Sequence, residues 1–176
     1  ASPSAAAAPA ASRAGPQARA PAPGSAGHPG GSRFRSIQPE DIHPDVFVAD
    51  LDPGPPATVV ECARVALALR ERLPGPLCVK TSGSKGLQVY GRVDDGRSGG
   101  QVRADMKRLA ERLERELPGL VVANMRRSLR RGRVLVDWSQ NNPTKTTVSV
   151  YSLRGRRRPT VSTPVTWAEV EAVRSP

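Results

Sequence analysis

The chain has 176 residues, which is enough for one domain with a tail but too few for two full-sized domains. It carries 27 Lys and Arg against 16 Asp and Glu, a formal net charge of +11, and all but four of the basic residues are arginine. Because the planar guanidinium group suits phosphates, this surplus favours an anionic polymer or a polyphosphate as the partner. A GC-rich coding sequence is the alternative explanation for the ratio of Arg to Lys.

The two cysteines exclude a disulfide scaffold and a zinc site built from Cys pairs. Cys62 and Cys78 both stand in apolar surroundings, so we expect them to be small core residues in a reducing compartment. No apolar stretch reaches the roughly 18 residues that a membrane span needs. These features predict a cytoplasmic protein with no membrane partner.

Residues 1–44 are predicted to be a disordered tail or linker. The first 39 residues contain no acidic residue, four arginines and long runs of Ala, Pro, Gly and Ser. Such a composition buries too little apolar surface to offset the entropy lost on ordering.

Residues 45–176 have the pattern of a folded domain. Steps of three and four between apolar residues predict the helices, and runs of β-branched residues between breakers predict the strands. In chain order we expect a strand over 46–52, a helix over 57–73, strands over 77–81 and 87–93, a helix over 101–117, strands over 134–138 and 146–153, and a closing helix over 167–173. This order predicts an α+β fold in which a mixed β-sheet is backed by two helices, as in palm-like or RNA-recognition-like cores.

Three aspartates are candidate metal ligands. Asp50 and Asp52 are two apart on a predicted strand, so both carboxylates leave the same face. A divalent cation would offset their repulsion, and oxygen-only ligands suit Mg²⁺ or Mn²⁺; a solvated strand end is the alternative. Asp137 interrupts an apolar strand and is either a third ligand, if its strand lies beside the first, or a cap for the turn at 141–143.

The loop between the strands at 77–81 and 87–93 has the composition of a phosphate site. Its glycines allow close backbone approach, Ser82 and Ser84 can donate hydrogen bonds, and Lys85 adds positive charge. It joins two strands and has no Gly-Lys-Ser/Thr entry to a helix, so it is not a Walker loop. An ordinary Gly-containing hairpin is the alternative.

A second basic feature precedes the strand that carries Asp137. Residues 126–133 include five arginines, and a loop of this kind beside a catalytic strand would follow a phosphate backbone. The candidate nucleic-acid contacts are Arg126, Arg127, Arg130 and Arg131. A solvated turn is the alternative.

Four motifs occur in order: Asp50-Leu51-Asp52-Pro53-Gly54; Thr81-Ser82-Gly83-Ser84-Lys85-Gly86-Leu87; Val136-Asp137-Trp138-Ser139-Gln140-Asn141; and Tyr151-Ser152-Leu153-Arg154-Gly155-Arg156 with Thr163-Pro164-Val165-Thr166-Trp167. Together they resemble the polymerase domain of bacterial DNA ligase D, a member of the archaeo-eukaryotic primase superfamily that acts in non-homologous end joining. The resemblance implies catalytic metal ligands at Asp50, Asp52 and Asp137, with Mn²⁺ or Mg²⁺ as the cofactor. It also implies triphosphate contacts from Ser82, Lys85 and Arg154.

The chain departs from the family pattern in two places. In the family, the histidine that ends the second motif helps to hold the triphosphate, and Gln88 occupies that position here as a fourth candidate nucleotide contact. Glutamine can donate a hydrogen bond but cannot become cationic. The family domain also has a segment upstream of the first motif, so the resemblance covers only its catalytic half. No Lys-x-Asp-Gly ligase motif occurs in the chain, so a ligase would be a separate module.

Three functional hypotheses follow. The first is a metal-dependent nucleotidyltransferase, a repair polymerase or primase that adds ribonucleotides or deoxyribonucleotides to DNA ends. Its partners would be DNA ends and nucleoside triphosphates, together with an end-binding protein and a separate ligase. The second is an inactive, basic remnant that binds DNA ends. The third, a glycosyltransferase-like Asp-x-Asp enzyme, is disfavoured because it gives Asp137 and the Ser-Gly-Ser-Lys loop no role.

Overall fold

The computed structural model describes residues 43–173, all within one compact unit of the chain, residues 36–176. The predicted tail therefore lies outside the described residues, apart from its last two positions. No helix in the described part of the chain is long and apolar enough to cross a membrane.

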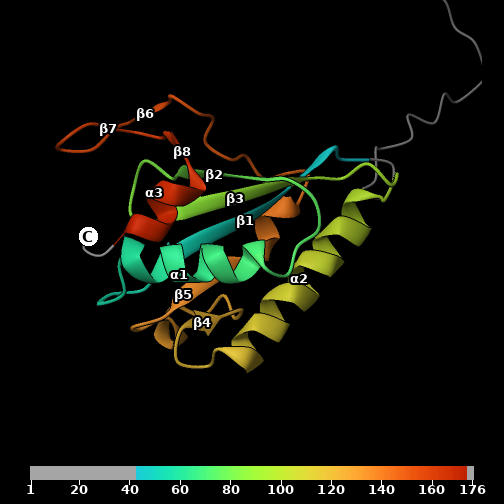
Figure 1. The fold of residues 1–176 in the computed structure, drawn as a ribbon, viewed down its shortest axis with the longest axis horizontal. Helices are drawn as coiled ribbons and strands as arrows, with labels where there is room; N and C mark the ends of the chain where they lie inside the picture. Colours follow the sequence, from blue (N-terminus) through green and yellow to red (C-terminus); the bar gives the residue numbers. More distant parts are fainter. Residues whose placement is uncertain (1–42, 174–176) are drawn as a thin grey trace, which may run out of the picture. The chain divides into compact units, whose positions relative to one another are not determined.

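A mixed six-stranded sheet forms the centre of the fold, in the order β4-β5-β1-β3-β2-β8 (Figure 1). Its strands are β1 (Val46–Pro53), β2 (Leu77–Thr81), β3 (Leu87–Arg92), β4 (Val121–Val122), β5 (Val134–Asp137) and β8 (Pro164–Val165). Only β4 and β5 are parallel; the other neighbours are antiparallel. A separate hairpin consists of β6 (Leu153–Arg154) and β7 (Thr160–Val161).

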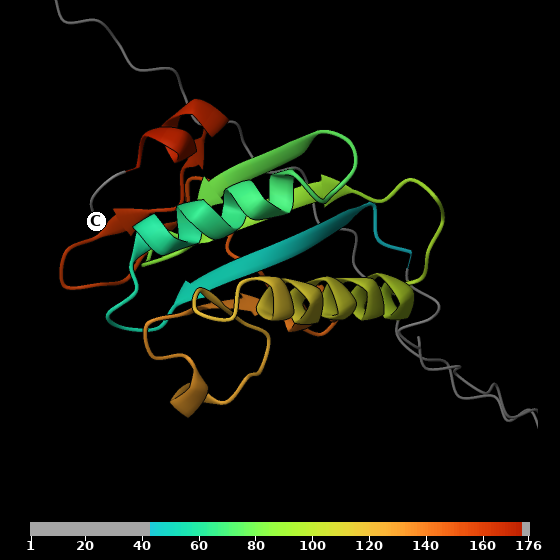
Figure 2. The same ribbon diagram turned by 60° about the horizontal axis from the view of Figure 1, so that its bottom comes forward.

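Two long helices, α1 (Val59–Arg70) and α2 (Gly99–Glu116), cover one face of this sheet (Figure 2). The short helix α3 (Trp167–Ala172) packs against α1. Each helix begins with a capping box, in which a Ser or Thr and the Glu or Gln three residues later satisfy free backbone N–H groups. The α+β prediction with two backing helices is therefore confirmed.

The core lies between the helices and the sheet. Helix α1 buries Val65, Ala66 and Leu69, and α2 buries Met106 and Leu113. They face the alternate strand residues that point toward the helices, namely Phe47, Ala49, Leu51, Val79, Leu87, Val89, Val134 and Val136. Within residues 43–173 no long helix covers the other face of the sheet, which carries polar strand residues such as Asp50 and Gln88.

Two predictions were wrong. Residues 146–152 contain no strand, although Thr and Val are frequent there. β-propensity describes fit to a pleated surface, and this segment has no ladder partner until residue 153 begins the hairpin. Cys62 is a core residue as expected, but Cys78 is exposed, because it occupies the strand face away from the helices.

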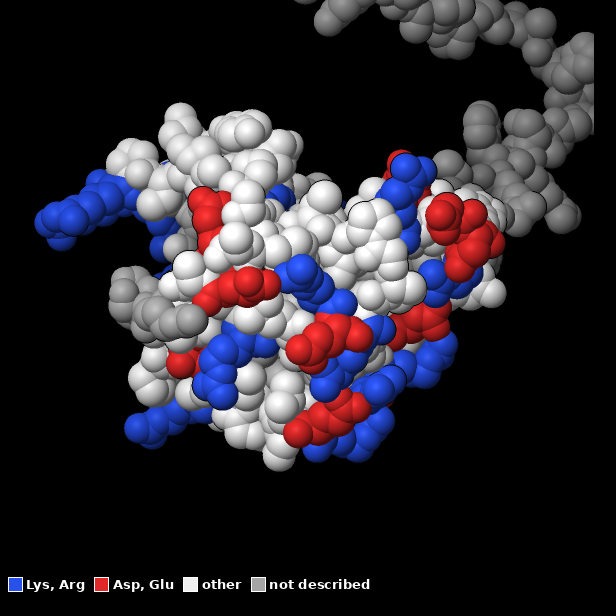
Figure 3. Space-filling model, viewed as in Figure 1, with Lys and Arg blue, Asp and Glu red and all other residues white. Residues whose placement is uncertain are grey.

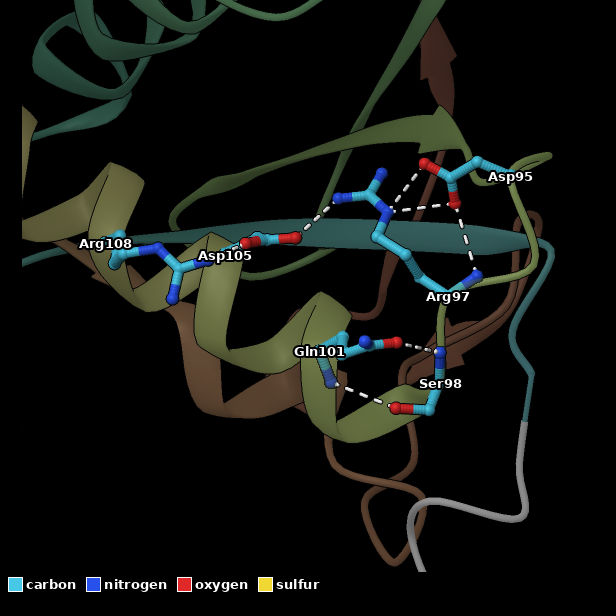
Figure 4. A network of polar contacts seen from close by, with 6 residues as sticks. All are labelled: Asp95, Arg97, Ser98, Gln101, Asp105 and Arg108. Carbon is cyan, nitrogen blue, oxygen red and sulfur yellow. Dashed lines mark hydrogen bonds and ion pairs between the residues drawn. The ribbon is translucent and has the colours of Figure 1, made fainter.

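Side-chain contacts support two irregular segments. The amide of Asn141 pairs with the backbone of Val48, accepting from its N–H at 2.9 Å and donating to its carbonyl at 2.8 Å. It therefore continues the sheet where β5 has already ended. Arg97 contacts Asp95 and Asp105, which ties the loop after β3 to the first turns of α2 (Figure 4).

Candidate functional site

A row of polar side chains crosses four strands on the sheet face away from the helices. Strand alternation turns Ala49 and Leu51 toward the core and Asp50 and Asp52 to the other face. In the antiparallel ladders Asp50 lies opposite Asp137 on one side and opposite Gln88 on the other. Gln88 in turn lies opposite Lys80. Residues paired directly opposite share a sheet face, so the row runs Asp137, Asp50, Gln88, Lys80.

Buried hydrogen bonds connect three members of this row. The Nζ of Lys80 donates to Oε1 of Gln88, and Nε2 of Gln88 donates to Oδ1 of Asp50 at 3.1 Å. Tyr90 Oη also donates to Oε1 of Gln88, at 3.0 Å. Because an ammonium can only donate, Lys80 orients the Gln88 amide so that its NH₂ group faces Asp50. Lys80 is itself anchored by a 2.9 Å bond to the buried Ser162 hydroxyl.

The aspartates repel one another in this environment. Burial and then the charge of Asp52 raise the pKa of Asp50 to about 6, while the hydrogen bond from Gln88 opposes the rise. Burial and the charge of Asp137 raise the pKa of Asp52, and the nearby Arg130 partly opposes that rise. The site is therefore an accumulation of negative charge that an additional cation would stabilise.

Asp137 also has a local capping role, at the 3₁₀ turn directly after its strand and not at the turn over 141–143 that the sequence suggested. Its Oδ1 accepts from the backbone N–H of Ser139 at 2.9 Å, so it caps the short 3₁₀ turn Trp138–Asn141, and Lys145 Nζ lies 3.8 Å from its Oδ2. Within residues 43–173, no group of three or more His, Cys, Asp or Glu side chains is arranged to hold a metal ion as it stands. Asp50 is turned toward Gln88 and Asp137 toward Ser139. The donor set nevertheless fits Mg²⁺ or Mn²⁺, because three carboxylates on adjacent strands share one face.

The Ser82–Gly86 loop lies at the end of β2 and β3, next to this row. The hydroxyl of Ser82 accepts from the backbone N–H groups of Ser84 and Gly86, at 3.2 and 3.1 Å. These amides are therefore directed into the loop, while the hydroxyl proton of Ser82 stays available for a ligand. Lys85 is exposed. Gly86 is required because a Cβ there would overlap the carbonyl oxygen of Leu51.

The β6–β7 hairpin passes over this loop. Thr160 donates to the carbonyl of Gly83, Arg156 donates to the hydroxyl of Ser84, and Ser162 donates to the carbonyl of Thr81 at 2.8 Å. Arg154 packs so closely that a Cβ at Gly83 would lie 2.9 Å from its Cγ. The candidate triphosphate residues Ser82, Lys85, Gln88 and Arg154 thus come from neighbouring elements.

Comparison with known proteins identifies the family of the chain. The model of the family "LigD, primase-polymerase domain" matches residues 26–176. The chain belongs to this family. It is 48% identical over 128 residues to the multifunctional non-homologous end joining DNA repair protein LigD of Mycobacterium tuberculosis, and 43% identical over 130 residues to the corresponding protein of Mycolicibacterium smegmatis. These alignments cover 71% and 70% of this chain but 17% of each relative, so the chain spans about a sixth of their length.

A solved structure of the polymerase domain from Mycobacterium tuberculosis ligase D, in complex with DNA, has the same fold. The two chains superpose with a TM-score of 0.71 at 45% sequence identity, over 75% of this chain and 48% of that one. The family resemblance and the fold class predicted from the sequence are therefore both confirmed.

In this LigD primase-polymerase chain the fold places the arginines of the basic segment in two different environments. Arg126, Arg127 and Arg131 are exposed beside the short turn Arg127–Leu129. Arg130 is turned inward, where its Nη2 donates to the carbonyl of Met125 at 2.6 Å and its charge acts on Asp52. Three of the four predicted nucleic-acid contacts are therefore free to meet a phosphate backbone, and the fourth lies beside the aspartates.

Sequence reasoning did not identify Lys80 as part of the site. A signal was present in Leu77-Cys78-Val79-Lys80. Side chains alternate along a strand, so Lys80 lies on the sheet face away from the core if Val79 points into the core. A groove of about 560 Å³ opens beside it, lined by Lys80, Tyr90, Pro164 and residues 147–150. The irregular segment that was predicted to be a strand therefore forms a wall of the groove next to the polar row.

Proposed function

We propose that this chain is the catalytic core of a metal-dependent nucleotidyltransferase that adds ribonucleotides or deoxyribonucleotides to DNA ends in non-homologous end joining. The observation that carries the proposal is the β1–β5 register, which places Asp137 directly opposite Asp50 with Asp52 on the same face. Three carboxylates beside a Ser-Gly-Ser-Lys loop are the components that nucleotidyl transfer requires. Membership of the LigD primase-polymerase family supports the same assignment.

In this proposal Asp50, Asp52 and Asp137 hold Mn²⁺ or Mg²⁺. When bound, such ions supply charge neutralisation and activation of the attacking hydroxyl. Asp50 and Asp137 would exchange their contacts with Gln88 and Ser139 for the ion. A pKa of about 6 leaves Asp50 mostly ionised at neutral pH, which is the state a cation needs.

The other residues bind and orient the substrates. The hydroxyl of Ser82, the side chains of Lys85 and Arg154 and the amide of Gln88 would contact the triphosphate, each with a donor group. Arg126, Arg127 and Arg131 would contact the nucleic-acid backbone, with Arg130 closer to the aspartates. DNA as the partner is supported by the DNA complex of the similar solved domain. An end-binding protein, a separate ligase and a cytoplasmic location complete the proposal.

Primer extension tests the proposal directly. The full chain is incubated with a labelled primer annealed to a template with a 5′ overhang, one ribonucleoside or deoxyribonucleoside triphosphate, and Mn²⁺ or Mg²⁺. We expect extension by the parent and a loss of at least about 100-fold in Asp50→Ala and Asp137→Ala, because each removes a metal ligand. Asp94→Asn is the matched control, because it alters an exposed carboxylate in the loop after β3, outside the polar row. Equal activity of all four proteins would refute the assignment.

One observation favours the second hypothesis, an inactive protein that binds DNA ends. Gln88 is buried and both ends of its amide are already engaged, by Lys80 and Tyr90 on one side and by Asp50 on the other. In this second hypothesis Gln88 has a structural role and does not bind a triphosphate. The two hypotheses separate if the parent binds a DNA end but shows no extension with either metal, in which case the binding protein is the correct description.

A further inference from the structure

A second basic surface lies at the other edge of the sheet from residues 126–131. We call residues 150–161, which contain β6 and β7, the arginine hairpin. From Trp138 to Ala168 the sequence has no Asp or Glu, and the hairpin carries Arg154, Arg156, Arg157 and Arg158. Figure 3 shows basic side chains projecting beyond the body of the molecule at the end where Figure 1 draws β6 and β7. The positive charge is therefore not compensated within the segment.

The hairpin also exposes apolar and aromatic surface. Four of the six large hydrophobic side chains that are exposed in residues 43–173 belong to it, and the most exposed are Leu153 at 74% and Tyr151 at 71%. Tyr151 has a φ of 61°, in the left-handed region that a bulky residue seldom occupies. This backbone is retained because the Tyr151 N–H donates to Ser162 at 2.7 Å and Ser162 donates back to Ser152 at 3.1 Å. Left-handed backbone at bulky residues is concentrated in functional sites.

The position of the hairpin is set by its contacts with the Ser82–Gly86 loop. Thr160 and Arg156 bond to Gly83 and Ser84 in this loop. Directly after the hairpin, Ser162 bonds to Thr81, the residue before the loop. By contrast, Arg157 and Arg158 are exposed and form no ion pair with the described residues. The hairpin is thus a supported element that carries two exposed guanidinium groups, which form no ion pair with the described residues, and an exposed aromatic side chain.

We propose that the arginine hairpin binds a single-stranded nucleic-acid segment, with Arg157 and Arg158 on phosphates and Tyr151 stacked on a base. Cationic groups that follow a backbone, interleaved with an exposed ring, are the combination that binds single strands without sequence preference. An acidic peptide would satisfy the arginines but would leave the ring without a flat partner. The surface is separate from residues 126–131, which lie between β4 and β5.

The inference rests on the proposed function only for the idea that the bound strand belongs to a DNA end. Its test therefore uses no nucleotide and no metal. Binding of a fluorescent single-stranded oligonucleotide to the full chain is measured by anisotropy in EDTA over a range of salt concentrations. Arg157→Ala/Arg158→Ala should reduce the log–log salt slope by up to about 1.4, since each phosphate contact on a single strand contributes about 0.7.

Matched controls separate local contacts from net charge. Arg64→Ala/Arg115→Ala removes the same two charges from exposed positions on α1 and α2 and should leave the slope at the parental value. Tyr151→Ala should weaken binding by about fivefold or more, whereas Tyr151→Phe keeps the ring and should bind like the parent. If the arginine variant matches its control, or Tyr151→Phe is as weak as Tyr151→Ala, the proposal is overturned.

A crosslinking experiment on the unaltered chain removes any dependence on folding of the variants. Irradiation of the complex with an oligonucleotide containing 5-bromouracil should give an adduct within residues 150–161. Adducts found only elsewhere would overturn the proposal. It would also be overturned if Tyr151→Ala weakened binding to a blunt duplex as much as it weakened binding to the single strand. If the chain shows this binding but no primer extension, the proposed nucleotidyltransferase activity is refuted and the proposal that the arginine hairpin binds a single strand is retained.

Discussion

Asp50 allows the electrostatics of the site to be tested without any substrate. Burial and neighbouring carboxylates raise its pKa from 3.8 to about 6, and the residue is only 8% exposed. Between pH 4 and 6 the folded protein therefore keeps a proton that the unfolded chain has released. Stability falls as the pH rises through this interval, and the full cost is present above it.

The magnitude follows from the same values. The difference between 3.8 and about 6 corresponds to about 3 kcal/mol of unfolding free energy, as an upper estimate for this one group. Asp50→Asn keeps the shape and removes the charge. Without metal it should be close to the parent in stability at pH 4 and more stable than the parent by up to about 3 kcal/mol at pH 7.5.

Urea denaturation at several pH values is the appropriate assay, because urea does not screen charge as a guanidinium salt does. Asp94→Asn, an exposed carboxylate, serves as the control and should follow the parent at every pH. Adding Mn²⁺ at pH 7.5 should stabilise the parent, by about 2.7 kcal/mol at 100 times the Kd, and should leave Asp50→Asn unchanged. A constant difference between Asp50→Asn and the parent across the pH range would refute the reasoning.

Three further outcomes are expected from the packing around the row. Gly86→Ala should lower the free energy of unfolding by about 3 kcal/mol in urea, because its Cβ would overlap the backbone of Leu51; a melting temperature within 1–2 °C of the parent would contradict this. Asn141→Ala should cost about 2 kcal/mol in the same assay through two lost bonds to β1, and Asn141→Asp, which keeps the acceptor but not the donor, should not restore it. Lys80→Met removes a cation that lowers the pKa of Asp50, so the loss of stability with rising pH should extend to higher pH. If the pH midpoint of this loss is unchanged, Lys80 does not affect the pKa of Asp50.

Much of this protein could be predicted from the sequence. Apolar spacing located α1 and α2 to within three residues at each end, and β-branched runs between breakers located the strands that form the middle of the sheet. The motifs around Asp50, Ser82 and Asp137 were sufficient to indicate the family, which the comparisons confirm. These features are local, because a few neighbouring residues determine periodicity, capping and motif spacing.

Only the tertiary structure decided which of these residues meet. The β1–β5 register that places Asp137 opposite Asp50 depends on pairing between residues 81 or more positions apart, and no local pattern encodes it. The same holds for Lys80, whose contact with Gln88 needs the β2–β3 pairing and the buried Ser162 brought back by the C-terminal segment. The strand predicted over 146–153 is the converse case. Its residues favour a strand, but residues 146–152 pair with no strand of either described sheet, and propensity alone does not supply a partner.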